Sequence, residues 1–452
     1  MRLRSLNHGI MKETDSYLDA FERFEGQAPQ PAWLRPLRQA GITSFKQQGF
    51  PTLQQEDWRF TNVAPIARLR LKPVFQPPVG SEASETLAGA PFKELAGSRL
   101  VFVDGHYSAR FSSPGRLPAG VKALNLVTAL TADSDFLEKY LGRYAGTQGN
   151  AFAALNQACF LDGALIYVPR GVSVPAPIQL LFVSSCSQAG AAIHPRNLVI
   201  AEADSQVTVI ETYVSAGKAA CLTNAVTELV AEDNAGVEFL KFQDEGVDSF
   251  HVATIQGQFG RASNVNVHSF ALGARLSRNN IRARLAGEGL ECILNGLYLT
   301  KDDQLADHHM IVEHAEPQCA SHEYFNGILD DRSKGVFHGR IYVHQIAQKT
   351  DAKQTNRNLL LSDDATVNTK PQLEIYADDV KCTHGATVGQ LNEEAVFYLR
   401  SRGLDTDTAR RMLVHAFAGE IIERVRWEPA REELDKIVWD RLEANPHLTE
   451  KK

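Results

Sequence analysis

Short apolar runs recur along the middle of the chain, each followed by a polar or glycine-containing break. From residue 156 onward they include Val207–Thr212, Val237–Phe242 and Val265–Phe270. Few stretches of helical periodicity interrupt them, so the pattern predicts an all-β unit. Periodicity alone leaves a sandwich, a barrel and a solenoid open. Residues 156–388 are too many for one sandwich of about 100 residues, which favours an irregular β-solenoid or a large double sheet.

Both ends of the chain are patterned for helices instead. Before residue 156, helical segments are joined by a linker at 73–87 and a short strand at 99–103. After residue 388 the first expected helix is Asn392–Arg402, ended by Gly403. The apolar stripes expected on the two later helices are Ala409, Met412, Leu413, Ala416, Phe417 and Ile421, and then Leu434, Ile437, Val438 and Leu442.

These patterns predict three domains. Residues 1–155 form a mainly helical domain with a linker and a short β segment, 156–388 form the β core, and 389–452 form a helical domain. The segment Met1–Ile10 shows no apolar periodicity, and a well-patterned helix follows it. We therefore expect that Met11 can serve as the start of the chain.

The composition is that of an ordinary globular protein, with 44% hydrophobic and 22% charged residues among 452. The net charge of −7 argues against a nucleic-acid-binding surface. No apolar run approaches the roughly 18 residues of a membrane span, and no apolar segment follows the basic start as in a signal peptide. The six cysteines are scattered without a C-x-x-C pair, so we expect reduced thiols and a cytoplasmic location.

The sequence lacks the motifs of the common enzyme classes. It has no Walker-type phosphate loop, no G-x-G-x-x-G fingerprint, no G-x-S-x-G elbow and no H-E-x-x-H pair. Three groups of histidines are interpreted as structural polar residues, because neighbouring strand residues such as His308 and His309 face opposite sides. The groups are Asp307, His308 and His309 with Glu313 and His314; Cys319 with His322 in an expected loop; and His338 with His344.

Cys382 and His384 are the candidate metal-binding residues. On an extended backbone, residues two apart point to the same face, so a thiolate and an imidazole would project side by side. These two ligands together suit iron, zinc or copper. The adjoining Gly385 leaves room for metal or sulfur to approach. The structural alternative is a buried strand thiol beside a hydrogen-bonded histidine.

The chain also contains longer motifs, at Glu56–Asn62, Phe152–Asn156, Pro195–Val199, Thr223–Glu228, Gly296–Tyr298, Asp307–His309, Ala347–Ala352, Pro371–Val380, Cys382–Gln390 and Phe397–Gly403. Together they resemble SufD-type subunits of the SUF iron–sulfur cluster assembly machinery, over nearly the whole chain. The paralogous SufB subunits share this plan but have an assembly cysteine before the region of Lys370–Val380. Here the stretch Ser362–Thr366 has no cysteine, so the chain is similar to the SufD branch.

The resemblance implies a right-handed parallel β-helix core between helical end domains. It implies pairing with SufB through the β-helices, and docking of the ATPase SufC on the C-terminal helices, with a homodimer expected when the chain is alone. The chain itself is expected to be non-catalytic. His384 matches the family histidine implicated in cluster formation at the SufB–SufD seam, and Cys382 matches a neighbouring cysteine. No cofactor is expected to be held stably by this chain alone, because the nascent cluster belongs to the complex.

Two other functions are left open by the residues themselves. A β-solenoid carbohydrate-active enzyme would carry clustered Asp, Arg and Lys along a groove, normally with an export signal. A stand-alone iron-binding protein would use the histidine-rich core and bind iron without any partner. The absence of an apolar signal segment counts against the first of these.

Overall fold

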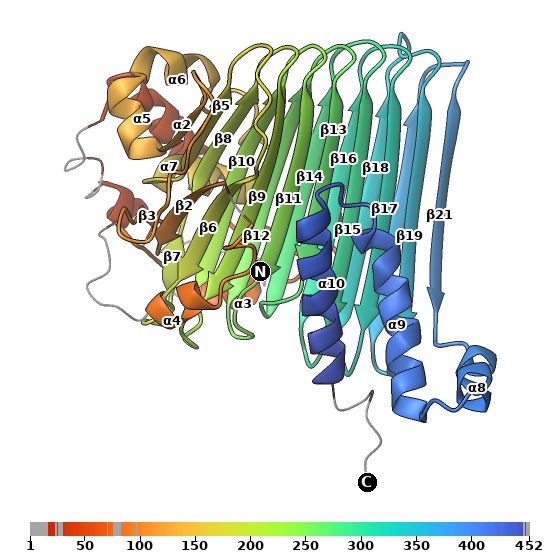
Figure 1. Ribbon diagram of the computed structural model, residues 1–452. Helices are drawn as coiled ribbons and strands as arrows, with labels where there is room; N and C mark the ends of the chain where they lie inside the picture. The colour runs from red at the N-terminus through yellow and green to blue at the C-terminus, as the bar shows by residue number, and fades with distance from the viewer. Residues whose placement is uncertain are drawn as a thin grey trace, which may run out of the picture.

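The centre of the molecule is a stack of parallel coils in which the chain alternates between two long sheets (Figure 1). The computed structural model describes residues 17–22, 25, 30–69, 71–75, 83–95, 97–445 and 448. Helices lie at the first end of the stack and beside its last coils (Figure 1). The prediction of a mainly β fold, with a β-solenoid core and helices at both ends, is confirmed.

Residues 17–22 are helical. The helices described from end to end are α2 (Leu34–Gln48), the 3-10 turn η1 (Glu56–Trp58), α3 (Ala64–Arg68), α4 (Ala83–Ala88), α5 (Leu126–Ala132), α6 (Ser134–Tyr140), α7 (Ala151–Cys159), α8 (Glu393–Ser401), α9 (Thr406–Ile422) and α10 (Glu428–Glu443). The first strands are β1 (Lys72–Pro73), β2 (Ser98–Val103), β3 (His106–Tyr107), β4 (Lys122–Asn125), β5 (Ala164–Val168), β6 (Ile178–Ser184), β7 (Ala191–Ile193) and β8 (Arg196–Ala201). The longer strands are β9 (Gln206–Ser215), β10 (Leu222–Ala231), β11 (Gly236–Asp244), β12 (Phe250–Phe259), β13 (Asn264–Ala271), β14 (Leu276–Leu285), β15 (Glu291–Thr300), β16 (Leu305–His314), β17 (Ala320–Leu329), β18 (Lys334–Val343), β19 (Asp351–Leu360), β20 (Thr366–Ile375) and β21 (Lys381–Gly389).

Successive long strands belong to different sheets. The main path of the 11-stranded sheet is β20-β18-β16-β14-β12-β10-β8-β5-β4, and its other two strands are β7, which pairs with β10, and β1, which pairs with β7. The 10-stranded sheet runs β21-β19-β17-β15-β13-β11-β9-β6-β2-β3. Each long strand pairs in parallel with the strand two elements later, so that His309 of β16 lies opposite His338 of β18. Two strands therefore complete one coil, and a side chain has its neighbours in the coils before and after it.

One corner of the coils is built repeatedly from a residue with positive φ. The φ angles lie between 53° and 69° at Asp204, Asn234, Ala262, Gly289, Gln318 and Lys349. Each of these residues donates its backbone N–H to a carbonyl one coil further on, as Asn234 does to Arg261 at 2.8 Å. Gly, Asn and Asp adopt this left-handed conformation most readily. The resulting ladder of corner hydrogen bonds holds neighbouring coils in register.

The interior of the solenoid changes from apolar to polar along the stack. In the middle coils, Val209, Phe239 and Val267 belong to one buried apolar cluster. In the last coils, buried polar side chains occupy inward positions. Gln354 Nε2 on β19, for example, donates a hydrogen bond to Glu323 Oε2 on β17 at 2.7 Å. This polar row is held together by hydrogen bonds between coils and needs no apolar pattern in the sequence.

The two ends of the stack differ. At the first end, the short strands β3 and β4 pair antiparallel with β2 and β5, and α2, α5, α6 and α7 lie around them (Figure 1). At the other end, β20 and β21 are the last strands of their sheets, and no strand in the described part of the chain pairs with their outer sides. Large apolar side chains are exposed here, including Tyr376 at 57% and Val388 at 49%. The last coil is thus an open edge.

The helices α9 and α10 lie across the outer face of the 10-stranded sheet (Figure 1). Val414, Leu434 and the strand residue Phe242 belong to one buried cluster between them. As predicted, α10 buries Leu434, Val438 and Leu442. The stripe predicted for α9 is partly wrong, because Met412 is 40% exposed while Val414 and Ala418 are buried. Packing against β15 and β17 sets which face of α9 is covered.

The sequence pattern does not predict β17 or β19, and the linker expected at 73–87 contains the helix α4. Residues 76–82 of that linker lie outside the described residues. So does Met1–Ile10, on which the expected start at Met11 depends. These differences leave the overall architecture as predicted.

Candidate functional site

Cys382 and His384 lie on β21, at the open end of the solenoid. In the pairing with β19, Cys382 is opposite Ala352 and His384 is opposite Gln354. Ala352 and Gln354 are buried on the inward row of their strand. Cys382 and His384 therefore continue that inward row into the last coil, side by side along the strand.

Because no further coil in the described part of the chain covers this row, the two side chains are accessible. Cys382 is half-buried and His384 is exposed. Burial raises the pKa of the Cys382 thiol, the backbone N–H of Ala352 lowers it and the Asp351 carboxylate raises it, with a net rise. The thiol is therefore protonated at neutral pH, and it would have to release that proton to bind a metal ion.

The backbone of β21 also presents unused groups at this edge. Lys381 donates its N–H to Thr350 O at 2.8 Å, which directs the backbone groups of Lys381 toward β19. In a parallel strand, alternate residues direct their N–H and C=O groups to opposite sides. Cys382, His384 and Ala386 accordingly direct theirs to the open edge. An added strand could pair with these residues directly.

The other candidate histidines are spread over the solenoid. His308 faces the interior and stacks on Tyr298, with ring centroids 5.5 Å apart. His322 lies within β17, not in the expected loop, and its Nε2 is 3.8 Å from Asp351 Oδ1. His344 Nε2 lies 2.8 Å from Glu313 Oε1. Among the described residues, none of these three belongs to a group of three or more side chains that could hold a metal ion.

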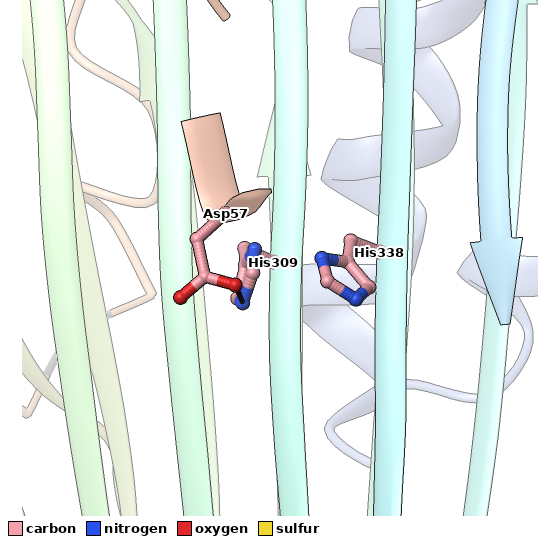
Figure 2. Close-up of side chains that lie close together, drawn as sticks. All are labelled: Asp57, His309 and His338. Atoms are coloured by element: carbon pink, nitrogen blue, oxygen red, sulfur yellow. Dashed lines mark ion pairs between the residues drawn. The ribbon is translucent and has the colours of Figure 1, made fainter. Parts of the chain in front are cut away.

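His309 and His338 form a cluster with Asp57 that sequence reasoning does not assemble (Figure 2). The two rings come from neighbouring strands with centroids 4.3 Å apart, and Asp57 reaches them from η1. One ligand atom from each residue lies within 4.8 Å of the others. The three residues line a cavity of about 410 Å³. The signal that could have found the cluster is the strand register, which places His309 opposite His338.

The motif around Trp58 explains how η1 reaches the solenoid. Trp58 is buried, packs on Phe152 of α7 at a centroid distance of 5.5 Å, and carries the Arg278 guanidinium 3.7 Å above its ring. Arg278 Nη1 also binds Asp307 Oδ2 at 2.6 Å, and Thr61 Oγ1 donates to the same oxygen. These contacts fix η1, and with it Asp57, against β14 and β16.

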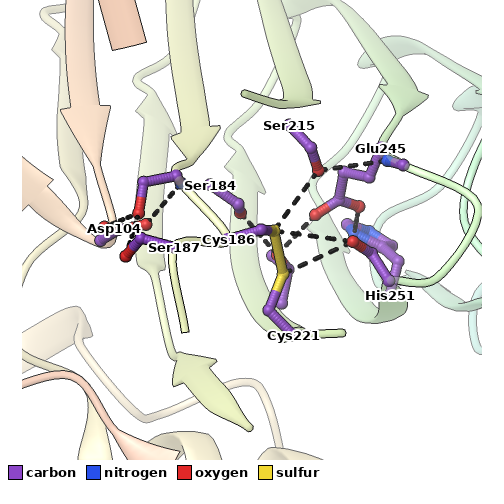
Figure 3. Close-up of a disulfide and its surroundings, with 12 residues drawn as sticks. Asp104, Ser184, Cys186, Ser187, Ser215, Cys221, Glu245 and His251 are labelled. Carbon is purple, nitrogen blue, oxygen red and sulfur yellow. Dashed lines mark hydrogen bonds and ion pairs between the residues drawn. A yellow bond between two sulfur atoms is a disulfide. The ribbon is translucent and has the colours of Figure 1, made fainter. Parts of the chain in front are cut away.

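The expectation of six reduced cysteines is wrong in one place. Cys186, in the loop after β6, is joined to Cys221, just before β10, by a disulfide (Figure 3). The free cysteines are Cys159, Cys292, Cys319 and Cys382. Ser249 Oγ lies 3.5 Å from Cys221 Sγ, and the nearby pair Glu245 Oε2 and His251 Nδ1 is 2.6 Å apart (Figure 3). The coil geometry brings together two cysteines that the sequence separates by 35 positions.

Comparisons with known proteins agree with this arrangement. Residues 182–417 match the family "SUF system FeS cluster assembly, SufBD core domain", and residues 11–180 match the "SufBD protein N-terminal region". The chain is 35% identical over 387 residues to an iron–sulfur cluster assembly SufBD family protein of Synechocystis, covering 83% of this chain and 84% of that protein. It is 31% identical over 410 residues to the iron–sulfur cluster assembly protein SufD of Escherichia coli, covering 90% and 93%. A chloroplastic protein of Arabidopsis thaliana is 30% identical over 401 residues, covering 86% and 82%.

Over most of its length the chain is therefore similar to proteins named for iron–sulfur cluster assembly. The chain belongs to the SufBD family and has a role in SUF iron–sulfur cluster assembly. Within the residues that the structure describes, every helix is too short or too polar to cross a membrane.

Proposed function

We propose that the chain is a non-catalytic scaffold subunit of a cytoplasmic SUF complex. It pairs with SufB through the open end of its solenoid, docks the ATPase SufC through its C-terminal helices, and contributes His384 to cluster formation at the seam between the two solenoids. Cys382 is a neighbouring ligand. The absence of a phosphate-binding loop assigns ATP hydrolysis to the partner.

The main support for this proposal is that His384 lies on β21, the strand that forms the open edge. The outward backbone groups of β21, the exposed side chains of β20 and β21, and the Cys382–His384 row all occur in one coil. An open edge strand pairs readily with another chain. Pairing there would bring the ligands of a second protein opposite His384.

The ligand count supports the proposal that the cluster belongs to the complex. An iron–sulfur cluster is normally held by four thiolate or imidazole ligands in total. Cys382 and His384 supply two on an exposed strand, and the partner would supply the rest. The chain alone therefore holds no cluster stably, which distinguishes this function from that of a stand-alone iron-binding protein.

The docking surface for SufC is proposed on α8 and the start of α9. The exposed fractions of Phe397, Tyr398 and Met412 are 71%, 57% and 40%. These side chains form an accessible, partly aromatic surface on α8 and the start of α9. Arg402 lies over the Tyr398 ring at 5.2 Å, so cationic and apolar groups are adjacent. An exposed helix with aromatic anchors and flanking charges fits a groove on a partner.

The test replaces His384 by Ala in cells that also produce SufB and SufC. We expect the complex to assemble and to contain the usual ratio of subunits, while its iron and sulfide content falls by roughly tenfold or more, as for loss of a metal-site residue. The measurement is the cluster content of the complex purified without air, together with its ability to transfer clusters to an acceptor protein.

Thr383→Ala is the matched control, because this side chain lies between the two candidates and points to the opposite face. It should leave the cluster content unchanged. Cys382→Ala should have the smaller effect of the two site variants. A fully assembled and fully active His384→Ala complex would contradict the proposed role. Loss of assembly itself would mean that His384 is a structural residue of the seam.

A further inference from the structure

The cluster of Asp57, His309 and His338 has the composition of a metal site. Two imidazoles and one carboxylate, with other positions open, are a common donor set for divalent iron and zinc. Metal–ligand bonds of about 2.1 Å require the ligand atoms to lie within about 4 Å of one another. They lie within 4.8 Å here, and Asp57, whose side chain is 46% exposed, can close the remaining gap by a small rotation.

The cluster contains buried polar atoms that the described residues leave without a hydrogen-bond partner. His309 is 4% exposed and its Nδ1 has none. Asp307 is 1% exposed, lines the same cavity, and has none at Oδ1. Buried polar atoms are nearly always satisfied by protein, water or an ion. His309 Nε2 lies 3.8 Å from Asp57 Oδ1, so an ion between these two residues would bind the His309 ring through Nε2. A water molecule coordinated to that ion would give Asp307 Oδ1 a hydrogen-bond partner.

The orientation of His338 fits the same interpretation. Its Nε2 lies 2.7 Å from Gln372 Oε1. Because an amide oxygen only accepts, the hydrogen is on Nε2 and the lone pair of Nδ1 is free. Metal-binding histidines usually donate their second ring N–H to an oxygen in this way, which fixes the ring. Gln372 on β20 is therefore the positioning residue for His338.

The charges around the cluster favour a metal that binds nitrogen over one that is held by charge alone. Arg278, Arg282, Arg340 and Lys370 surround it, and three of them are paired with carboxylates: Arg278 with Asp307, Arg340 with Glu374 and Lys370 with Glu56. Magnesium and calcium need several oxygen ligands and negative charge. Zinc, iron and cobalt in their divalent forms bind imidazole strongly in a neutral or weakly charged site.

We propose that Asp57, His309 and His338 bind one divalent transition-metal ion, and that this ion clamps η1 to β16 and β18. The site lies on the 11-stranded sheet, whereas Cys382 and His384 lie on the other sheet, so the two sites are separate. A metal that binds only the folded arrangement also stabilises it. The thermal stability of the chain with and without the metal therefore tests the site independently of cluster assembly.

The experiment uses the isolated full-length chain, stripped with a chelator and titrated with Co²⁺, whose visible absorption reports nitrogen ligands. We expect one equivalent of Co²⁺ per chain, displaced by Zn²⁺, and a higher melting temperature when Zn²⁺ is added. His309→Gln and His338→Gln should lose the absorption. Asp57→Asn, at an exposed position, should fold normally and weaken binding by about tenfold or more.

Two controls separate this site from the other histidines. His344→Gln removes a histidine outside the cluster and should bind Co²⁺ as the unaltered chain does. The double variant Cys382→Ser, His384→Gln should also bind normally, even if the function proposed above is wrong. The inference is overturned if the unaltered chain binds no Co²⁺, if Asp57→Asn binds it with unchanged affinity and spectrum, or if only the double variant loses binding.

Discussion

Glu323 illustrates how single residues inside the solenoid respond to burial. Its side chain has no exposed surface, Gln354 donates to Oε2, and Oε1 has no hydrogen-bond partner among the described residues. Burial raises the pKa of Glu323 to about 8, and the hydrogen bond from Gln354 lowers it only in part. At neutral pH this carboxyl group is largely protonated in the folded chain. In the unfolded chain it is ionised.

This difference predicts a pH-dependent stability. Between the ordinary pKa of 4.5 and the folded value of about 8, the folded chain keeps a proton that the unfolded chain releases. The contribution of Glu323 to stability therefore falls as pH rises, by up to about 1.4 kcal/mol per pH unit. Glu323→Gln removes this dependence. Urea unfolding at pH 5, 6, 7 and 8 should show the variant gaining stability over the unaltered chain as pH rises.

The control for these unfolding measurements is the exposed Glu423 at the end of α9. Glu423→Gln should differ from the unaltered chain by the same small amount at every pH. A Glu323→Gln advantage that does not change with pH would show that the carboxyl is ionised in both states. Buried water reaching Oε1 would be the physical reason.

The residue scale also shows what sequence reasoning could reach at the site. The i, i+2 spacing of Cys382 and His384 is visible in the sequence, because it depends only on an extended backbone. The cluster of Asp57, His309 and His338 is not visible, because its members are far apart in sequence. Finding it requires the register between β16 and β18 and the position of η1, which are set by packing. The Cys186–Cys221 disulfide is hidden for the same reason.

At the scale of elements, the sequence predicts strands where their inward side chains are apolar. Val237, Phe239 and the residues around them form an apolar run that marks β11. The sequence pattern does not predict β19, because Gln354, Asn356 and Asn358 fill its inward row. These amides are satisfied by neighbouring coils; Asn356 Nδ2, for example, donates to Phe325 O at 3.1 Å. Hydrophobic periodicity cannot identify a strand whose buried row is polar.

The C-terminal helices lead to a prediction about the ATPase. Phe397 and Tyr398 on α8 are exposed. The free energy of unfolding of the double variant Phe397→Ser, Tyr398→Ser should therefore lie within about 0.5 kcal/mol of that of the unaltered chain. Removing two aromatic anchors should weaken SufC binding by at least about tenfold. The measurement is affinity by titration, with co-purification of SufB recorded in parallel.

Val127→Ser, at an apolar position 51% exposed on α5, is the control for surface apolarity. It should leave SufC binding unchanged. Truncation after Gly403 is a poorer experiment, because α9 and α10 cover buried strand residues such as Leu240 and Phe242. Unchanged SufC affinity of the double variant would move the docking surface away from α8.

The whole molecule has one blocked end and one open end, and this leads to a prediction about pairing. Ala386 directs its N–H to the open edge, so Ala386→Pro removes a donor at that edge without removing a bond to β19. We expect the variant to fold, to lose most of its affinity for SufB, and to lose any homodimer of the isolated chain. Sedimentation of the variant alone and with SufB measures both effects.

Thr387→Pro provides the contrast, because the N–H of Thr387 points toward β19. This substitution should lower the stability of the chain itself, by about 3 kcal/mol or more if the whole ladder is disturbed. Normal pairing by the Ala386→Pro variant would exclude strand addition at β21. In that case the partner would have to contact side chains of the last coil only.

The difference between the two ends also sets how large an assembly can grow. A stack of parallel strands open at both ends would add copies without limit and form a fibre. Here the short antiparallel strands β3 and β4 and the surrounding helices close one end. Joining two such chains by their open ends leaves only closed ends outside. The product is a finite body of two solenoids, and growth terminates after a single addition.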